Sequence, residues 1–450
     1  MMLRYCSALT AAILLVLVLW VPSYCQQSLL QAGPMLGHVE MQTAQLWVQT
    51  KQAANVQIKF WPDSNSKAIS TTQPILTTSD NHFIAKPQAI GLSNGVLYRY
   101  TVLINGKACN FSYPTTFKTQ KLWQFRTDPP AFKVAIGSCY YHPEPAVDRP
   151  GTPYGANLEI FSSIYAAKPD AMVWLGDNIY SREVDFGSKY GFYRRHTMAR
   201  SEPLLQPLLA AAPHYAIWDD HDYGPNDADR SWAGKTWTEA AFNDFWCNPT
   251  TNSVGNGGIT STTLVNDVQF FLMDDRYHRS PNGDQTGREK SYLGKQQMQW
   301  LVDNLIYSKA TFKIVCIGGQ VLNPVAAHEN YATYAEERNE LLNLIQKAKV
   351  KGVLFLSGDR HHTDLIKMER LGTYPLYDLT VSPLTSGPAK PGKDEDEAST
   401  GRMPNTLVTD RNFGILSFSG PAKDRKMVIS IHAVDGKMIW EKTIAASELR

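Results

Sequence analysis

Two hydrophobic patterns divide the chain. Between about residues 31 and 120, short segments alternate apolar and polar residues, and turn residues such as Asn94-Gly95 and Asn105-Gly106 separate them. The clearest segments are 44–50, 56–60 and 98–102. Alternation with a period of two is typical of strands that are buried on one face. We therefore predict a small all-β sandwich in this region.

From Phe132 onward, apolar runs too short for helices alternate with segments of helical spacing, such as residues 157–165. Each run ends in a glycine or an acidic turn, and the five runs are 132–139, 171–177, 214–222, 312–320 and 351–362. Strands that alternate with helices indicate an α/β core, with functional groups at the carboxyl ends of the strands.

The C-terminal part of the chain supports further expectations. Residues 427–432 and 437–440 alternate again, and we expect them to be strands that close the second sheet of the catalytic domain. The segment 387–400, rich in proline, glycine and charge, reads as a solvated surface loop.

The N-terminus predicts export. Arg4 is followed by an apolar segment from Leu9 to Val21 and by small residues at Ser23 and Cys25, a pattern typical of a secretory signal peptide. A lipoprotein with an acylated Cys25 is the alternative. We expect a signal peptide at 1–25, a β-sandwich domain at 26–127 and a catalytic domain at 128–450, in a periplasmic, cell-surface or secreted protein without a later transmembrane span.

Composition narrows the class of protein. A chain of 450 residues with 43% hydrophobic and 19% charged residues is globular and long enough for two domains. The formal charge of +2 gives no indication of nucleic-acid binding. Beyond the signal, only Cys109, Cys139, Cys247 and Cys316 remain, which is no disulfide framework. Whether Cys247 and Cys316 pair stays open, as does the oligomeric state.

Candidate metal ligands follow the ends of the predicted strands. Carboxylate oxygens suit Ca²⁺, Mg²⁺, Mn²⁺ or Fe³⁺, whereas imidazole and thiolate favour transition metals, so a mixed set suggests more than one ion. Asp177 can bridge two ions through its two oxygens. The candidates are Cys139, Asp177, Tyr180, Asp219, Asp220, Asn226, Asp359 and His361, with His362 as an alternative to its neighbour.

Three of these assignments compete with simpler readings. His221 lies among Asp219, Asp220 and Asp222, which suits a general acid, although a histidine can also cap a turn. Tyr180 could be a packed aromatic residue and Cys139 a small buried one. If both bind one ion instead, thiolate and phenolate together indicate Fe³⁺.

Five motifs occur in an order that resembles the PhoD-like alkaline phosphatases, a branch of the calcineurin-like metallophosphoesterases. They are Gly137-Ser138-Cys139, Leu175-Gly176-Asp177-Asn178-Ile179-Tyr180, Trp218-Asp219-Asp220-His221-Asp222, Gly319-Gln320-Val321 and Ser357-Gly358-Asp359-Arg360-His361. The preceding β-sandwich resembles that family's N-terminal domain. Two departures from the wider superfamily, Cys139 in place of Asp-x-His and Gln320 in place of a histidine, are expected of this branch.

The resemblance implies a fold, a pair of metals and an activity. The fold is an α/β/β/α sandwich of two sheets, preceded by a fibronectin-III-like β-sandwich, and the metals are Fe³⁺ and Ca²⁺. By analogy Cys139, Asp177, Tyr180 and Asp359 hold iron. Asp177 bridges to calcium, which Asp220 and His361 bind, with Asp219 and Asn226 as further candidates.

The expected function is hydrolysis of phosphate monoesters, and of diesters as a further substrate class. Metal-bound hydroxide would attack phosphorus directly while His221 protonates the leaving group. One alternative is a phosphodiesterase or phospholipase D-like activity at the same site. The other is a non-catalytic surface-binding protein stabilised by metals.

Overall fold

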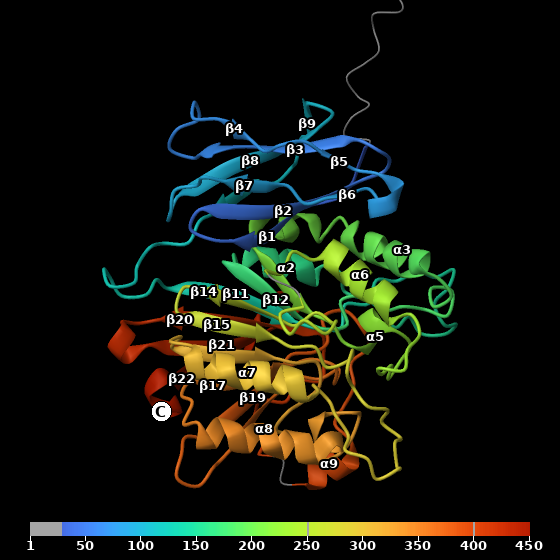
Figure 1. Cartoon of the computed structure of the whole chain (residues 1–450), viewed down its shortest axis with the longest axis vertical. Helices are drawn as coiled ribbons and strands as arrows, with labels where there is room; N and C mark the ends of the chain where they lie inside the picture. The colour runs from blue at the N-terminus through green and yellow to red at the C-terminus, as the bar shows by residue number, and fades with distance from the viewer. Residues whose placement is uncertain (1–28, 250–251, 399–400) are drawn as a thin grey trace, which may run out of the picture.

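A computed structural model describes residues 29–249, 252–398 and 401–450 (Figure 1). The predicted signal peptide lies outside the described residues. Within those residues no helix is long and apolar enough to cross a membrane.

The first part of the chain is a β-sandwich, as the alternating segments predict. The strands of one sheet are β1 (Leu30–Val39), β2 (Thr43–Thr50), β6 (Ile84–Ala85) and β7 (Gln88–Ile90). The other contains β3 (Asn55–Pro62), β4 (Ser70–Thr71), β5 (Ile75–Leu76), β8 (Leu97–Ile104), β9 (Lys107–Ala108) and β10 (Thr116–Lys118). Alternate residues such as Leu46, Ile58 and Val102 are fully buried between the sheets, which is why the alternation is visible in the sequence.

A second region begins at β11 (Phe132–Gly137), so the predicted boundary at residues 127 and 128 falls in the connection after β10. One of its sheets has the order β13-β12-β11-β20-β21-β22. The parallel members β11, β12 (Ala171–Leu175) and β13 (His214–Ile217) contain the first three apolar runs.

The C-terminal strands extend this same sheet rather than close the second one. They are β20 (Asn412–Ser419), β21 (Lys426–Ala433) and β22 (Met438–Ala445). β20 pairs antiparallel with β11, and the rings of Phe132 and Phe418 stack with their centroids 4.8 Å apart. Our expectation for these strands was therefore wrong, because alternation identifies a strand but not the neighbour with which it pairs.

The other sheet has the order β14-β15-β16-β17-β19-β18. Its strands are β14 (Ser261–Val265), β15 (Val268–Leu272), β16 (Phe312–Cys316), β17 (Val353–Ser357), β18 (Asp364–Met368) and β19 (Leu376–Thr380). β15, β16, β17 and β19 are parallel, and β16 and β17 contain the fourth and fifth apolar runs.

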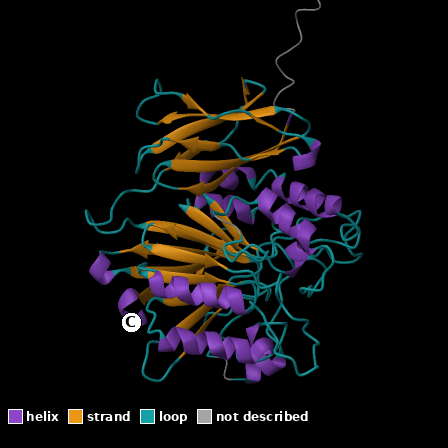
Figure 2. Ribbon diagram, in the orientation of Figure 1, coloured by secondary structure: helices purple, strands orange, loops and turns teal. Residues whose placement is uncertain are grey.

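Helices cover the outer faces of the two stacked sheets, which gives the predicted α/β/β/α order of layers (Figure 2). On the side of the β-sandwich lie α2 (Ile160–Ala166), α3 (Lys189–Arg200), α4 (Gln206–Ala211) and α6 (Lys235–Phe245). On the opposite side lie α7 (Lys295–Tyr307) and α8 (Ala335–Lys347). The short α5 (Asp220–Tyr223) follows β13. Brief 3₁₀ turns occupy 79–81, 331–334, 422–424 and 446–449.

The acidic segment 387–400 is not simply a solvated loop. It contains a short helix, α9 (Lys393–Glu397), and the side chain of Glu395 is buried. The two Glu395 oxygens accept hydrogen bonds from the Arg360 guanidinium, each at 2.8 Å. A bidentate arginine partner compensates for burial of the carboxylate, and the sequence pattern does not reveal such a partner.

The four cysteines among the described residues are buried free thiols, Cys109, Cys139, Cys247 and Cys316. Cys247 and Cys316 therefore do not pair in this structure.

Candidate metal centre

Four of the predicted ligands follow strand ends in the left-handed backbone conformation. Cys139 comes after β11 with φ 61°, Asp177 after β12 with φ 51°, and Asp359 and His361 after β17 with φ 60° and 57°. Non-glycine residues adopt this conformation uncommonly, and such residues concentrate at functional sites. The sharp turns thus place these four residues just beyond the ends of β11, β12 and β17.

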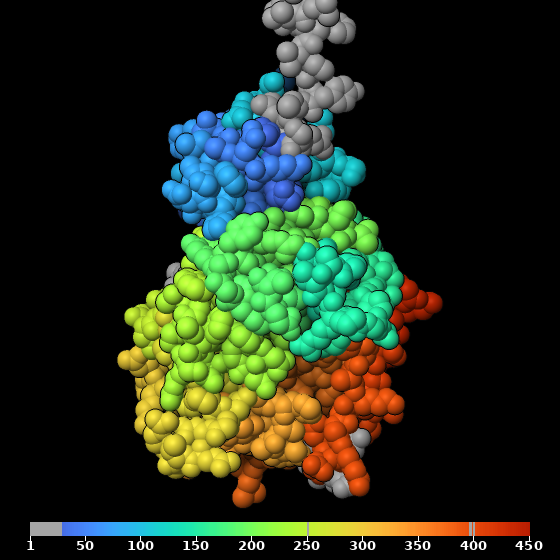
Figure 3. All heavy atoms as spheres, turned by 90° about the vertical axis from the view of Figure 1, so that its right-hand side faces the viewer, coloured from blue at the N-terminus to red at the C-terminus, as the bar shows by residue number. Residues whose placement is uncertain are grey.

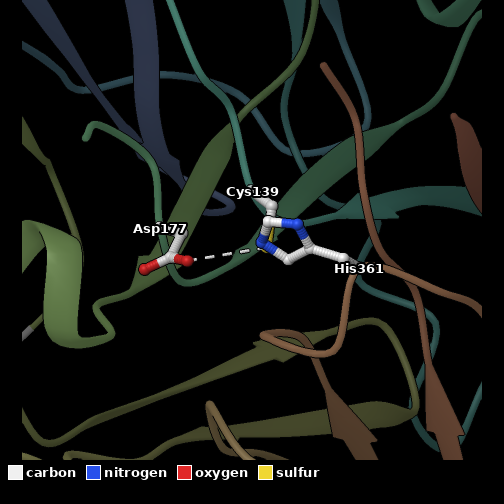
Figure 4. Close-up of side chains that lie close together, drawn as sticks. All are labelled: Cys139, Asp177 and His361. Atoms are coloured by element: carbon white, nitrogen blue, oxygen red, sulfur yellow. Dashed lines mark hydrogen bonds between the residues drawn. The ribbon is translucent and has the colours of Figure 1, made fainter. Parts of the chain in front are cut away.

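Three of these side chains converge from separate loops (Figure 4). The ligand atoms of Cys139, Asp177 and His361 all lie within 4.8 Å of one another. The thiol sulfur of Cys139 lies 3.6 Å from Oδ2 of Asp177. The hydroxyl of Tyr180 lies 3.0 Å from Nε2 of His361, so the phenol borders the same group.

A second group shares Asp177. Ligand atoms of Asp177, Asp220 and His221 also lie within 4.8 Å of one another. While Oδ2 of Asp177 faces Cys139, Oδ1 accepts the backbone N–H of His221 at 3.3 Å. Its two oxygens therefore contact different residues, and the side chain belongs to both groups of potential ligands. We call Cys139, Asp177, Tyr180, Asp220, His221 and His361 the strand-end cluster.

Electrostatics in the strand-end cluster favour a bound cation. Burial and the charges of Asp220 and Cys139 raise the pKa of Asp177. Burial also raises the pKa of the Cys139 thiol to about 12, and the pKa of Tyr180 is raised by burial and by Asp177. A metal ion between them would favour the thiolate, carboxylate and phenolate forms instead. This donor set of soft sulfur and hard oxygens fits metal binding.

The surroundings of Asp220, unlike those of Asp177, favour the ionised carboxylate. Burial opposes its charge, but His221, Arg276 and the backbone N–H of Asp227 together outweigh burial and lower the pKa of Asp220. That N–H donates to Oδ2 of Asp220 at 2.8 Å.

Asp359 lies beside the cluster without belonging to either group of three. Burial and the charge of Glu329 raise the pKa of its carboxyl to about 7, and its own charge contributes to the raised pKa of Cys139. Its role as an iron ligand remains a prediction.

Two of the less certain candidates have other partners. Oδ1 of Asp219 accepts a hydrogen bond from Nε of Arg276 at 2.6 Å, and Asp219 caps α5. The side chain of Asn226 is exposed and donates to Oδ1 of Asp227 at 2.8 Å. Asp219 occurs in none of the groups of His, Cys, Asp and Glu ligand atoms found among the described residues.

A charged network beside the cluster was missed from the sequence. The carboxylate of Glu329 accepts hydrogen bonds from Arg276 at 2.7 Å and from Arg279 at 2.9 Å, and it forms a third acidic group with Asp220 and Asp227. Arg276 had a signal that could have been used, because it follows β15 within Asp274-Asp275-Arg276, the same strand-then-acid pattern as in the other motifs. Glu329, in a loop, had none.

His221 combines partial exposure with acidic neighbours. Its side chain is 21% exposed, so it is accessible to a substrate, and Nε2 lies 4.0 Å from Oδ2 of Asp220. Burial lowers the pKa of His221, while the charge of Asp220 raises it. The imidazole ring packs on the ring of Tyr180, with the centroids 4.2 Å apart.

The ambiguity between His361 and His362 is resolved by their hydrogen bonds. Nδ1 of His361 lies 2.6 Å from the carbonyl oxygen of Gly387, to which it donates, so Nε2 is left to face the cluster. His362 is buried away from it, with Nε2 3.9 Å from Asp364. The resemblance paired His361 with Asp220, whereas the structure groups it with Cys139 and Asp177.

Gln320 is likewise occupied elsewhere. Its amide donates to Thr380 at 2.8 Å and accepts from Arg360 at 2.7 Å.

Two solved structures share this architecture. The structure of PhoD matches with a TM-score of 0.74 at 16% identity, covering 95% of this chain and 93% of that one. The purple acid phosphatase PPD1 from yellow lupin (Lupinus luteus) seeds matches with a TM-score of 0.67 at 13% identity, covering 92% of this chain and 74% of that one. The fold is that of the metallophosphoesterases.

Sequence comparison gives the family. The model of the family described as PhoD-like phosphatase matches residues 150–420, more than half of the chain. The chain therefore belongs to the PhoD-like phosphatases, a family of phosphoric ester hydrolases, as the ordered motifs predicted. A second family model, described as a domain of unknown function (DUF7800), matches residues 27–122.

One curated relative is similar over part of its length. Alkaline phosphatase D of Bacillus subtilis (strain 168) is 25% identical over 241 residues, which are 43% of this chain and 41% of that protein. The match thus spans less than half the length of the relative.

Proposed function

We propose that this protein is an exported, metal-dependent phosphoesterase that hydrolyses phosphate monoesters, with diesters as a second substrate class. The carrying observation is that Asp177 belongs to two groups of potential ligand atoms, one with Cys139 and His361 and the other with Asp220 and His221. Membership of the PhoD-like phosphatases supports the reaction class. The apolar N-terminal segment of the sequence supports export.

The metals that we propose are Fe³⁺ and Ca²⁺. Cys139, Asp177, Tyr180 and Asp359 would hold iron, and Asp177, Asp220 and His361 would hold calcium, although His361 lies close enough to Cys139 to serve the iron side. When bound, the ions would polarise the phosphoryl oxygens and increase the acidity of a water molecule.

The protein's own side chains would orient the substrate and move one proton. His221 is exposed enough to meet the leaving oxygen of the ester and would donate its proton there. Asp220 favours the protonated imidazole by its charge. Gly387 fixes the tautomer of His361, and the Arg276–Glu329 pair holds the Asp219 turn.

The test is the rate of p-nitrophenyl phosphate hydrolysis by the Asp177→Asn variant. An amide cannot carry the charge that a bridging ligand needs, so we expect activity to be abolished while circular dichroism shows an intact fold. Asp303→Asn, an exposed aspartate on α7, is the control and should retain full activity. Retained activity in Asp177→Asn would overturn the proposed function.

A further inference from the structure

A groove opens at the same sheet edge as the strand-end cluster. Its volume is about 520 Å³, within the range of small-molecule sites. It lies where the β21–β22 hairpin meets the loop that follows Gly387. Its lining combines the apolar side chains of Pro388, Val434, Met438 and Ile439 with charged ones, such as those of Arg411 and Asp435.

The strand register places the groove at the edge of the sheet where the strand-end cluster lies. β11 runs toward Cys139, and its Ile136 pairs with Gly414 of β20. Asn412 of β20 pairs with Ala433 of β21, and His432 pairs with Met438 of β22. The hairpin 434–437 therefore projects from the edge at which the cluster lies. In Figure 3, which faces this edge, the red C-terminal segment emerges at the right beside the blue-green segment near residue 150.

Residues 385–388 connect the groove to the strand-end cluster. Pro388, on the groove side, directly follows Gly387, whose carbonyl oxygen accepts the hydrogen bond from His361. Nε of Arg411 donates to the carbonyl oxygens of Thr385 and Ser386, each at 2.9 Å. The remaining nitrogens of Arg411 donate to Asn157 and Tyr154.

Tyr154 contacts both Arg411 and the strand-end cluster. Its hydroxyl lies 3.1 Å from Nδ1 of His361, and its side chain is 45% exposed. Tyr154 thus contacts the imidazole of His361 with its hydroxyl and Arg411 of the groove with its carbonyl oxygen.

The groove presents apolar side chains to solvent. Met438 is 55% exposed and Ile439 is 45% exposed, at the start of the edge strand β22, and Val434 and Pro388 line the same space. Exposed apolar residues that line a concave surface indicate a binding site more strongly than scattered ones do.

We propose that this groove binds the apolar alcohol group of a phosphodiester substrate, the one that is not released. The inference rests on the proposed phosphoesterase function and deepens it. With the leaving oxygen at His221, the alcohol group on the second ester oxygen of a diester can extend past His361 and Tyr154. It would then reach toward Met438 and Ile439. A small monoester would leave the groove empty.

The test compares two diesters with the same leaving group, methyl p-nitrophenyl phosphate and octyl p-nitrophenyl phosphate. In both, the oxygen of water bonds to phosphorus and the bond from phosphorus to p-nitrophenolate breaks. The products are the alkyl phosphate, p-nitrophenolate and the released protons. Each methylene removed from water favours binding by roughly a factor of four. We expect kcat/KM of the wild type to be about tenfold or more higher for the octyl ester.

Variants of groove residues test whether the preference for the octyl ester arises in the groove. Met438→Asp and Ile439→Asp place a charge in the groove, and each should reduce the octyl-to-methyl ratio of kcat/KM to near one. Leu371→Asp is the matched control, because Leu371 is an exposed leucine outside the groove lining, and it should keep the wild-type ratio. An unchanged ratio in both groove variants would overturn the proposal.

Two further measurements separate the remaining outcomes. Calorimetric binding of octylphosphonate against methylphosphonate, which have no ester bond to hydrolyse, tests the groove without turnover, so the proposal still stands or falls if neither diester is hydrolysed and the proposed function fails. Gel filtration of the same variants detects an interface between copies. A changed oligomeric state with an unchanged ester ratio would reject substrate binding.

Discussion

Asp222 accepts the backbone N–H of Asn178 with both carboxylate oxygens, at 3.0 and 3.1 Å. It also accepts the N–H of Asp219 at 3.0 Å. One buried side chain thus joins the loop after β12 to the turn after β13. Asp177 and Asp220 lie on these two segments, so Asp222 sets their separation although it does not face the cluster itself.

Replacing Asp222 should therefore lower both the stability of the fold and the rate of hydrolysis. Burial raises the pKa of this carboxyl to about 7. Asp222→Asn has a similar shape, but its single oxygen cannot accept all three bonds, and its NH₂ would oppose an N–H. We expect a loss of about 1–3 kcal/mol in the free energy of unfolding, measured with urea, and a reduced rate. An unchanged urea midpoint would refute this account.

His221→Asn tests proton donation through the leaving group. p-Nitrophenolate leaves without a proton more readily than phenolate does, so loss of a general acid should slow phenyl phosphate hydrolysis by about 10²- to 10⁴-fold and p-nitrophenyl phosphate hydrolysis much less. His82→Asn, at a histidine that stacks on Tyr193 and is not in the strand-end cluster, is the control. Equal losses for both esters would instead assign His221 a binding role.

Tyr180→Phe tests the identity of one ion. A phenolate bound to Fe³⁺ gives a visible absorption band by charge transfer, so we expect this band to weaken or disappear in the variant. Tyr141→Phe is the control, because the Tyr141 hydroxyl donates to Asp148 and its ring lies 5.1 Å from that of Tyr180. An unchanged spectrum at equal iron content would exclude the phenolate ligand.

Because of His214, we expect the protein to lose stability in acid, independently of the metal site. Nδ1 accepts from Trp174 at 3.0 Å and Nε2–H donates to the carbonyl oxygen of Leu208 at 3.1 Å, so both nitrogens are matched only in the neutral ring. Burial lowers the pKa of His214 to about 3, from about 6.5 in the unfolded chain.

Protonation of His214 therefore destabilises the folded protein, in the pH range between these two pKa values. The contribution of neutral His214 is complete above pH 6.5 and is lost as the pH falls toward 3. Between pH 6.5 and 4, the urea midpoint of the wild type should fall more steeply than that of His214→Gln, whose amide can accept and donate without titrating. Parallel curves for the two proteins would contradict the prediction.

The sequence predicted the strand-end residues because each directly follows an apolar run. Cys139 and Asp177 follow neighbouring parallel strands of one sheet, so their convergence could be expected. His361 follows a strand of the other sheet, and only the packing of the two sheets brings it to them. Asn226 lacks this support, since it lies several residues beyond the strand, in a loop that turns outward.

Long-range charge pairing could not be predicted in the same way. Glu395 lies in a run of charges typical of a solvated loop, and only the fold brings Arg360 to it. The same holds for Glu329 with Arg276 and Arg279. No local pattern records a partner that is many residues away.

The left-handed turns at Cys139, Asp177, Asp359 and His361 have a consequence for assembly of the site. These conformations are held by the ends of β11, β12 and β17, so formation of the two sheets already places the ligand side chains. Metal ions would then bind to side chains that are already in position, and no loop would have to close around them. Little of their binding free energy would be consumed in ordering the backbone, and the order in which the two ions arrive would matter little to the geometry.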